Sequence, residues 1–311
     1  MKSNPKKTER ATQFIILFVI IFMTSIVLFA DSGHVAKKIN FLDVLLLPRI
    51  WVSAIFCLIG LVLLIKSFVT HNLRLISLFV IFFTFAVIST LPIGNFARGM
   101  GMHPSPLCSI IKPLMFIKAG RTVPIVFTAI LFSVAVLTII GNKLFCGWVC
   151  PIGALQEVFH RIPLSKKFKI KIPFKIPNTI RIAIFILFII LLFTIRRNIY
   201  EYFNPFEFLH WNFELLSIVI LSIVLIASIF IFRPFCYFIC PLGVFTWILE
   251  HISIIRIKVD SKKCTKCNKC IEESPCLAIS AILEEKKTRP DCFACGRCIE
   301  ICPENALKFR K

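Results

Sequence analysis

The sequence predicts an α-helical multi-pass membrane domain of about six transmembrane helices, followed by a small C-terminal α+β domain. Composition predicts the membrane domain: 58% of the 311 residues are hydrophobic, 33 are phenylalanine and the mean hydropathy is +0.86, too apolar for a soluble globular protein. Cysteine spacing predicts the second domain, because most of the 14 cysteines fall in four clusters and two clusters lie near the C-terminus. We expect the membrane domain over residues 1–253 and the C-terminal domain over residues 254–311.

Six apolar runs approach or reach the length of about 20 residues that a helix needs to cross a bilayer. They lie near residues 13–30, 50–66, 75–92, 122–140, 179–195 and 214–232. The first run follows a basic start and resembles a secretory signal, but it is longer than the apolar core of a signal peptide. We therefore expect it to be a membrane anchor.

The orientation follows from charge and from redox chemistry. Lys2, Lys6, Lys7 and Arg10 precede the first run, which predicts a cytoplasmic N-terminus, and an even number of spans returns the C-terminus to the same side. Free thiolates also belong in a reducing compartment. The sequence thus predicts a prokaryotic cytoplasmic-membrane protein with its C-terminal domain in the cytoplasm.

The formal net charge of +21 has a membrane explanation. Basic residues flank a span at Lys166, Lys167, Lys169, Lys171 and Lys175, where they would meet anionic lipid headgroups. We expect lipid, and no nucleic acid, to be the partner of this charge.

A nine-residue motif occurs twice, ninety residues apart, over residues 145–153 and 235–243. Each copy holds two cysteines followed by proline: Cys146 and Cys150 in the first copy, Cys236 and Cys240 in the second. Residues at i and i+4 share a helix face, so each pair is expected to present two sulfurs in one direction, with the proline opening the next helix. The amphipathic stretches 154–162 and 244–252 are expected to lie along the headgroups. The four thiols predict a further metal site or iron–sulfur centre; buried structural thiols are the alternative.

The C-terminal cysteines have the spacing of a two-cluster bacterial ferredoxin. In that pattern the fourth cysteine of each half serves the other half's [4Fe-4S] cluster. We assign one cluster to Cys264, Cys267, Cys270 and Cys302, and the second to Cys292, Cys295, Cys298 and Cys276. The first half departs from the pattern, because five residues separate its third and fourth cysteines. Zinc is the alternative, but a third cysteine at the same spacing adds nothing to a zinc site.

Secondary structure is predicted around these cysteines. Alternating residues at 254–259 and 306–310 predict paired terminal strands, and 278–283 with 287–290 predicts a second hairpin. Short helices are expected to carry Cys270 and Cys298.

These motifs resemble the NapH/NosR/CcoG membrane ferredoxins. The resemblance rests on residues 146–157, on the second copy at 236–243 and on the eight C-terminal cysteines. It implies an electron-transfer subunit of an oxidoreductase system, with redox proteins of the membrane or periplasm as partners, rather than a stand-alone enzyme. Neither a phosphate-binding loop, a dinucleotide fingerprint nor a nucleophile elbow is present, and no catalytic residue is assigned.

Alternatives remain open at this point. The CcoG resemblance allows a copper reductase or metal-centre assembly factor, in which Cys108 and His103 would gain importance as soft donors. A structural or sensing role for the clusters is a third hypothesis. Quinol is a further candidate partner, with a site near Glu201, Glu207 and His210. Cys57 lies inside a predicted span, where a small apolar packing role is expected.

Overall fold

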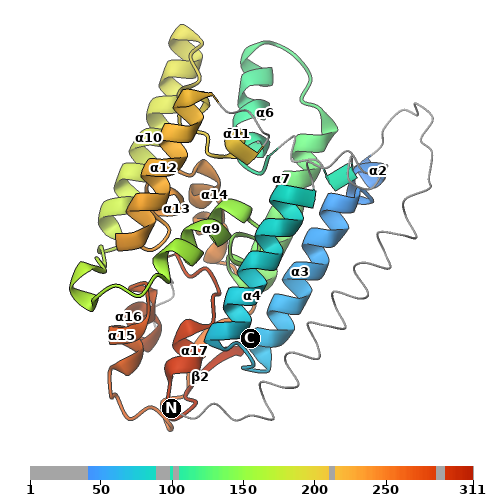
Figure 1. Cartoon of the computed structure of the whole chain (residues 1–311). Helices are drawn as coiled ribbons and strands as arrows, with labels where there is room; N and C mark the ends of the chain where they lie inside the picture. The colour runs from blue at the N-terminus through green and yellow to red at the C-terminus, as the bar shows by residue number, and fades with distance from the viewer. Residues whose placement is uncertain (1–40, 89–98, 101–104, 210–213, 285–290, 311) are drawn as a thin grey trace.

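A helical bundle with a cysteine-rich segment at one end makes up the protein (Figure 1). The structure is a computed structural model and describes residues 41–88, 99–100, 105–209, 214–284 and 291–310. The helices of the bundle are α2 (Phe41–Leu45), α3 (Pro48–Ile65), α4 (His71–Phe82), the π-helix η1 (Phe83–Val87), α6 (Cys108–Lys118), α7 (Ile125–Gly141), α8 (Leu144–Trp148), α9 (Pro151–His160), α10 (Lys175–Ile195), α11 (Phe206–Leu209), α12 (Leu215–Phe230), α13 (Pro234–Phe238) and α14 (Pro241–Glu250). Two 3-10 turns, η3 (Lys166–Phe168) and η4 (Ile199–Glu201), lie in connections.

Every predicted span that falls within the described residues contains a helix. The run at 50–66 corresponds to α3 and the run at 179–195 to α10, and these two helices, of 18 and 21 residues, are long and apolar enough to cross a membrane. The runs at 75–92, 122–140 and 214–232 contain shorter apolar helices, α4 with η1, α7 and α12. The predicted first span at 13–30 lies outside the described residues. Among the described residues, two helices therefore meet the length criterion, and six transmembrane helices remain a prediction.

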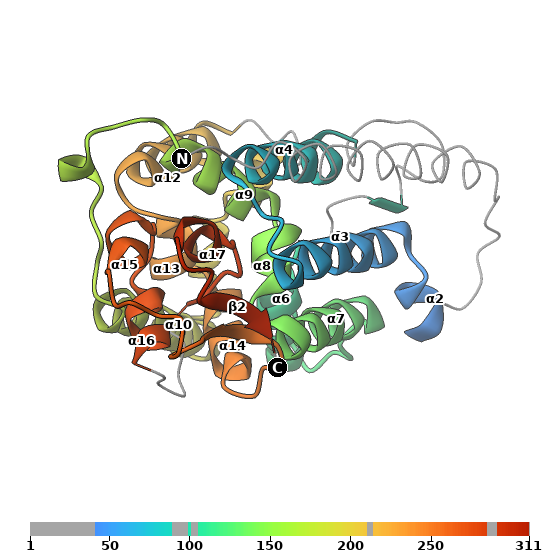
Figure 2. The ribbon, with the colours of Figure 1, turned by 90° about the horizontal axis from the view of Figure 1, so that it is seen from below.

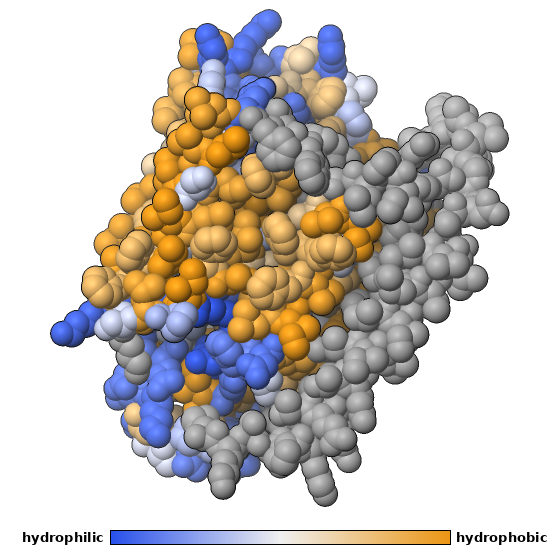
Figure 3. All heavy atoms as spheres, in the orientation of Figure 1, coloured by the Kyte–Doolittle hydropathy of each residue, from blue (hydrophilic) through white to orange (hydrophobic). Residues whose placement is uncertain are grey.

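Apolar side chains cover most of the face of the bundle seen in Figure 3. Exposed large hydrophobic residues occur on α4, η1, α10 and α12, at Phe79, Phe83, Ile186, Leu187, Ile190, Leu215, Ile223 and Ile226. Figure 3 shows a hydrophobic band above a hydrophilic end, and Figure 1 places α15, α16 and α17 at that end. Such a band is the surface that a bilayer requires.

The duplicated motif lies inside the bundle. Its second half forms α9 in the first copy, which packs against α4 and α12, and α14 in the second copy, which packs against α7 and α10. The stretches 154–162 and 244–252, predicted to lie along the headgroups, are each partly buried. In the first, Ala154 and Glu157 of α9 lie in the protein interior, and Ile162 is exposed. In the second, Val244 is buried, and Ile248 and Ile252 are exposed.

The C-terminal segment, residues 254–310, contains the strands β1 (Arg256–Val259) and β2 (Leu307–Arg310) and the short helices α15 (Lys269–Glu273), α16 (Ala278–Leu283) and α17 (Arg297–Ile301). The two strands pair antiparallel with Ile257 opposite Phe309, which confirms the predicted terminal pairing. The predicted second hairpin was wrong at 278–283. Ala278, Ile279, Ala281 and Ile282 are all buried, and this spacing fits a helix rather than a strand. Figure 2 shows the segment from below, beneath the bundle.

Candidate metal centres

The first set of thiols lines one cavity. Cys264, Cys267, Cys270 and Cys302 surround a space of about 380 Å³ between β1, α15 and the end of α17. Cys270 lies within α15 and interacts electrostatically with the other three sulfurs. The structure therefore brings together the four cysteines that the sequence grouped, although they are drawn from both halves of the segment.

The second set is buried against the bundle. Cys298 lies in α17, and its sulfur interacts with those of Cys295, Cys292 and Cys276. Burial raises the pKa of the Cys276 thiol to about 12. Buried thiolates at such positions need a cation or a cluster to stabilise them, which fits an iron–sulfur ligand set. Cys298 also interacts with Cys270, so the first and second sets are neighbours.

The duplicated motif brings the third set together, but with a geometry that the sequence did not predict. Cys146 lies in α8 and Cys236 in α13, whereas Cys150 and Cys240 are the extended residues before α9 and α14. The two cysteines of a copy therefore do not share one helix. The cause is the proline after each second cysteine, which disfavours helical backbone at the residue before it. The electrostatic interactions of Cys240 with Cys236, Cys146 and Cys150 nevertheless join all four sulfurs.

Each copy supplies a polar contact to the first cysteine of the other. Gln156 Nε2 of the first copy donates to the Cys236 sulfur at 3.4 Å. Thr246, at the equivalent position of the second copy, interacts with the Cys146 sulfur, while its hydroxyl donates to the Leu242 carbonyl at 2.9 Å. An arginine also binds the backbone carbonyl of each first cysteine. Arg233 Nη1 donates to the Cys146 carbonyl at 2.7 Å, and Arg181 Nη1 donates to the Cys236 carbonyl at 3.0 Å. The third set thus has approximate twofold symmetry in its sulfur environment.

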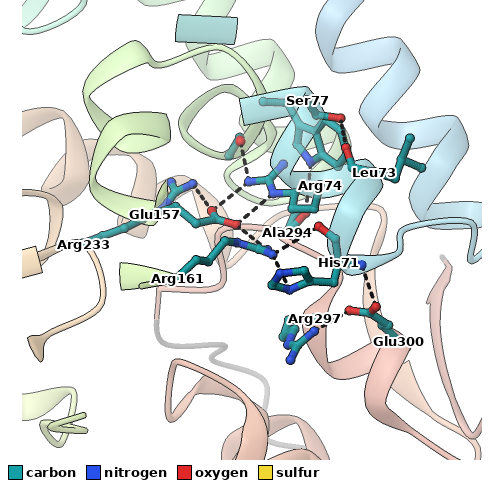
Figure 4. Close-up of polar contacts among 12 residues, drawn as sticks. His71, Leu73, Arg74, Ser77, Glu157, Arg161, Arg233, Ala294, Arg297 and Glu300 are labelled. Atoms are coloured by element: carbon teal, nitrogen blue, oxygen red, sulfur yellow. Dashed lines mark hydrogen bonds and ion pairs between the residues drawn. The ribbon is translucent and has the colours of Figure 1, made fainter. Parts of the chain in front are cut away.

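A buried carboxylate balances the cations on each side. Glu157 accepts from Arg74, Arg161 and Arg233 at 2.6 to 3.0 Å (Figure 4). Burial alone would raise its pKa, but the three guanidinium groups hold the pKa of Glu157 well below the usual range. The carboxylate is therefore ionised at neutral pH.

Near the second copy of the motif, the buried carboxylate is that of Asp291, which belongs to the C-terminal segment. It pairs with Lys143 and lies 3.3 Å from Arg181 Nη1, and all three side chains are fully buried. Lys143 and Arg233 each lie three residues before the first cysteine of their copy. The pairing anchors the C-terminal segment to the motif.

Phe293 adds further contacts between the C-terminal segment and the two motif copies. Its ring lies 5.5 Å from that of Tyr237 and 4.8 Å from the guanidinium carbon of Arg233. Trp148 Nε1 donates to the Ala294 carbonyl at 3.0 Å. Gly147 permits this approach, since an added Cβ there would lie 2.2 Å from the Phe293 carbonyl oxygen. Cys292 and Cys295 of the second set are thereby held beside the third set.

The sequence reading missed these polar and aromatic partners. The basic residue at the same position before both cysteine pairs was visible in the repeat and could have indicated Lys143 and Arg233. By contrast, Asp291 and Arg181 lie far from the motif in sequence, and no local pattern marks them.

The other residues singled out in the sequence do not belong to the three sets of thiols. Cys57 in α3 interacts with Cys146, and Cys108 opens α6 with its sulfur 3.2 Å from the Ser105 hydroxyl. His103 and His210 lie outside the described residues, so neither the soft-donor site nor the quinol site is tested there. Glu207 accepts from Asn204 at 2.7 Å.

The donor chemistry of the three sets fits iron–sulfur clusters. Within the described ranges, no three histidine, cysteine, aspartate or glutamate side chains are arranged as ligands of a single metal ion. A [4Fe-4S] cluster instead takes one thiolate at each of four irons, and each set supplies four thiols.

Comparisons with known proteins agree with this chemistry. The family model described as a 4Fe-4S binding domain matches residues 122–171 and 213–259, and each match contains one copy of the motif. The ferredoxin-type protein NapH of Haemophilus influenzae is 30% identical over 236 residues, which cover 70% of this chain and 79% of that protein. NapH of Escherichia coli is 24% identical over 226 residues, covering 69% and 78%. The methylamine utilization ferredoxin-type protein MauN of Methylobacillus flagellatus is 26% identical over 190 residues, covering 58% and 66%. No solved structure matches.

The fold and the thiol sets define a membrane iron–sulfur protein that transfers electrons within an oxidoreductase system. The regulatory protein NosR of Stutzerimonas stutzeri is a more distant relative, 24% identical over 201 residues that cover 58% of this chain and 28% of that protein. The chain belongs to the family of the ferredoxin-type protein NapH. The resemblance to NapH and NosR inferred from the motifs is confirmed.

Proposed function

We propose that this protein relays electrons from a cytoplasmic or quinol donor to a redox partner in the membrane or periplasm. Two [4Fe-4S] clusters are held by the C-terminal cysteines and a third iron–sulfur centre by Cys146, Cys150, Cys236 and Cys240. When bound, such clusters accept and release single electrons. The observation that carries the proposal is the position of Asp291 to Cys295, which joins the C-terminal segment to the space between the two motif copies.

Interactions among the protein's own residues join the three sets of thiols. Cys298 interacts with Cys270 of the first set, and Arg233 interacts with both Cys295 of the second set and Cys236 of the third. The three sets therefore form a continuous series. Lys143, Arg181 and Arg233 surround the inner sets with buried positive charge, which favours the anionic character of a cluster bound by four thiolates.

The proposed topology is multi-pass, with the N-terminus and the C-terminal segment in the cytoplasm of a prokaryotic cell. The apolar band above a hydrophilic end supports it (Figure 3). A thiol-rich segment on the cytoplasmic side is consistent with the reducing environment that its free cysteines need.

The test is a count of iron and acid-labile sulfide in the full chain, purified without oxygen, with EPR spectra before and after reduction. We expect about twelve irons per chain, and about eight when Cys146, Cys150, Cys236 and Cys240 are changed to serine. The matched control changes Cys57 and Cys108, which lie outside the sets, to alanine and should retain the native count. About eight irons in both the native chain and the serine variant would confine the clusters to the C-terminal segment.

A further inference from the structure

The first set of thiols is the most exposed of the three sets. Cys267 is exposed, whereas Cys292 and Cys298 of the second set and Cys146 and Cys236 of the third are buried. The cavity of the first set is open and is bordered by the loop that carries Cys264 and Cys267. An electron arriving from a soluble molecule therefore has its shortest approach at this loop.

The same loop carries a concentration of positive charge. Lys262, Lys263, Lys266 and Lys269 are all exposed, and we call residues 261–269 the lysine loop. Asp260 fixes its start, because its carboxylate accepts from the Lys262 amide at 3.2 Å and its carbonyl accepts from the amides of Lys263 and Cys264 at 3.0 Å. These contacts use backbone groups and leave the lysine side chains at the surface.

The position of the lysine loop argues against lipid as its partner. It leads directly into α15, which lies at the hydrophilic end of the molecule, away from the apolar band (Figures 1 and 3). Basic residues that meet lipid headgroups are found next to a span, as at Lys175 where α10 begins. The lysine loop faces the aqueous phase instead.

We propose that the lysine loop docks a soluble, acidic one-electron carrier of the ferredoxin or flavodoxin kind. The carrier loses one electron, the group held by Cys264, Cys267, Cys270 and Cys302 gains one, and no bond is made or broken. Complementary charge raises the rate of encounter and fixes orientation. Glu284 and Glu304 border the same cavity, so a carboxylate-rich partner is attracted to the lysine side and repelled from theirs. This inference rests on the proposed function, because it names the donor for the same relay.

The experiment uses the full chain in neutral lipid nanodiscs under anaerobic conditions, with a reduced acidic [2Fe-2S] ferredoxin as the probe. Stopped-flow absorbance measures the second-order rate of reduction at several salt concentrations. The variant changes Lys262, Lys263 and Lys269 to glutamine; Lys266 is kept because its backbone has a positive φ of 53°. The matched control changes the exposed Lys167, Lys308 and Arg310 to glutamine, removing the same charge elsewhere.

We expect the lysine-loop variant to lose about tenfold in rate at low salt and to show a weaker salt dependence, whereas the control variant keeps the native rate. Reduced methyl viologen, a small cation that needs no docking surface, should reduce both variants at least as fast as the native chain. Equal rates with the ferredoxin in the lysine-loop variant and the native chain would overturn the docking surface while leaving the relay intact. Absence of clusters from the native chain would instead overturn the proposed function itself.

Discussion

The two copies of the cysteine motif meet the same electrostatic requirement with different parts of the chain. In the first copy, Glu157 lies in the motif's own helix and pairs with Arg74, Arg161 and Arg233. The second copy has Trp247 at the equivalent position, and the carboxylate beside it, Asp291, comes from the C-terminal segment. The Glu157 network therefore lies within the bundle, whereas Lys143 and Arg181 are paired only by the segment that docks on the bundle. The buried cations Lys143 and Arg181 thus form the site at which the C-terminal segment attaches to the bundle.

The substitution with the largest expected effect removes the Glu157 carboxylate. Glu157→Gln leaves the buried cations of Arg74 and Arg233 without their carboxylate, which we expect to cost about 3–5 kcal/mol of folding free energy. Thermal unfolding of the purified protein, followed by tryptophan fluorescence, measures the loss. The matched control is Glu201→Gln, at an exposed residue, which should change stability by less than about 0.5 kcal/mol. A native unfolding temperature in Glu157→Gln would contradict the role of this network.

Asp291→Asn tests the borrowed carboxylate. It leaves Lys143 and Arg181 buried without a carboxylate partner. We expect this change to weaken docking of the C-terminal segment on the bundle by about 3 kcal/mol. We expect limited proteolysis to cleave the segment faster while the bundle stays intact. The double variant Lys143→Met with Asp291→Asn should recover part of the protection, because one buried charge of each sign is removed. Equal cleavage rates in Asp291→Asn and the native chain would show that the segment is held by other contacts.

The two copies should also differ in their response to pH. Burial, followed by the charge of Lys169, lowers the pKa of His160 to about 4, and Glu157 and Arg161 also face this ring. The unfolded chain binds the proton near pH 6.5, so stability present above pH 6.5 is lost as pH falls toward 4, by about 1–2 kcal/mol. The variant His160→Gln should flatten this part of the unfolding profile. An unchanged profile would assign the pH dependence to other groups.

The smallest expected effect is on the midpoint potential of the third centre, and it comes from the polar side chains beside its sulfurs, Thr246 and Gln156. Thr246→Val removes the hydroxyl that interacts with the Cys146 sulfur, and we expect the midpoint potential of the third centre to fall by the equivalent of about 0.5–1.5 kcal/mol. Thr246→Ser keeps the hydroxyl and is the control, measured by the same EPR redox titration. Gln156→Leu should shift the potential in the same direction but also destabilise the fold, because Gln156 Oε1 accepts from the Phe235 amide at 2.9 Å. A native potential in Thr246→Val would contradict this assignment.

Much of this arrangement was predictable from sequence, because it depends on local spacing. Cysteine intervals predicted sets of thiols whose sulfurs interact in the structure. Alternating residues at 254–259 and 306–310 predicted the paired strands, which the structure has at Arg256–Val259 and Leu307–Arg310. The spans within the described residues fell on helices for the same reason. These features follow from residue periodicity, which a single sequence displays directly.

The features that sequence reasoning missed depend on tertiary contacts. The i, i+4 spacing of Cys146 and Cys150 indicated one helix face, but Pro151 ended the helix between them. The polar residues of α9 indicated exposure, yet Glu157 is buried because Arg74 and Arg233 reach it from distant elements. The role of Asp291 follows from the docking of a segment more than one hundred residues away from Lys143 and Arg181, which no local pattern reports.

The borrowed carboxylate imposes an order on biosynthesis. Chains emerge and fold from the N-terminus, so Glu157 can pair with Arg74 and Arg233 as soon as α4, α9 and the start of α13 have packed together. Lys143 and Arg181 pair with Asp291, which is translated after both copies of the motif. These two buried cations therefore gain their carboxylate only when the segment that carries Asp291 docks on the bundle.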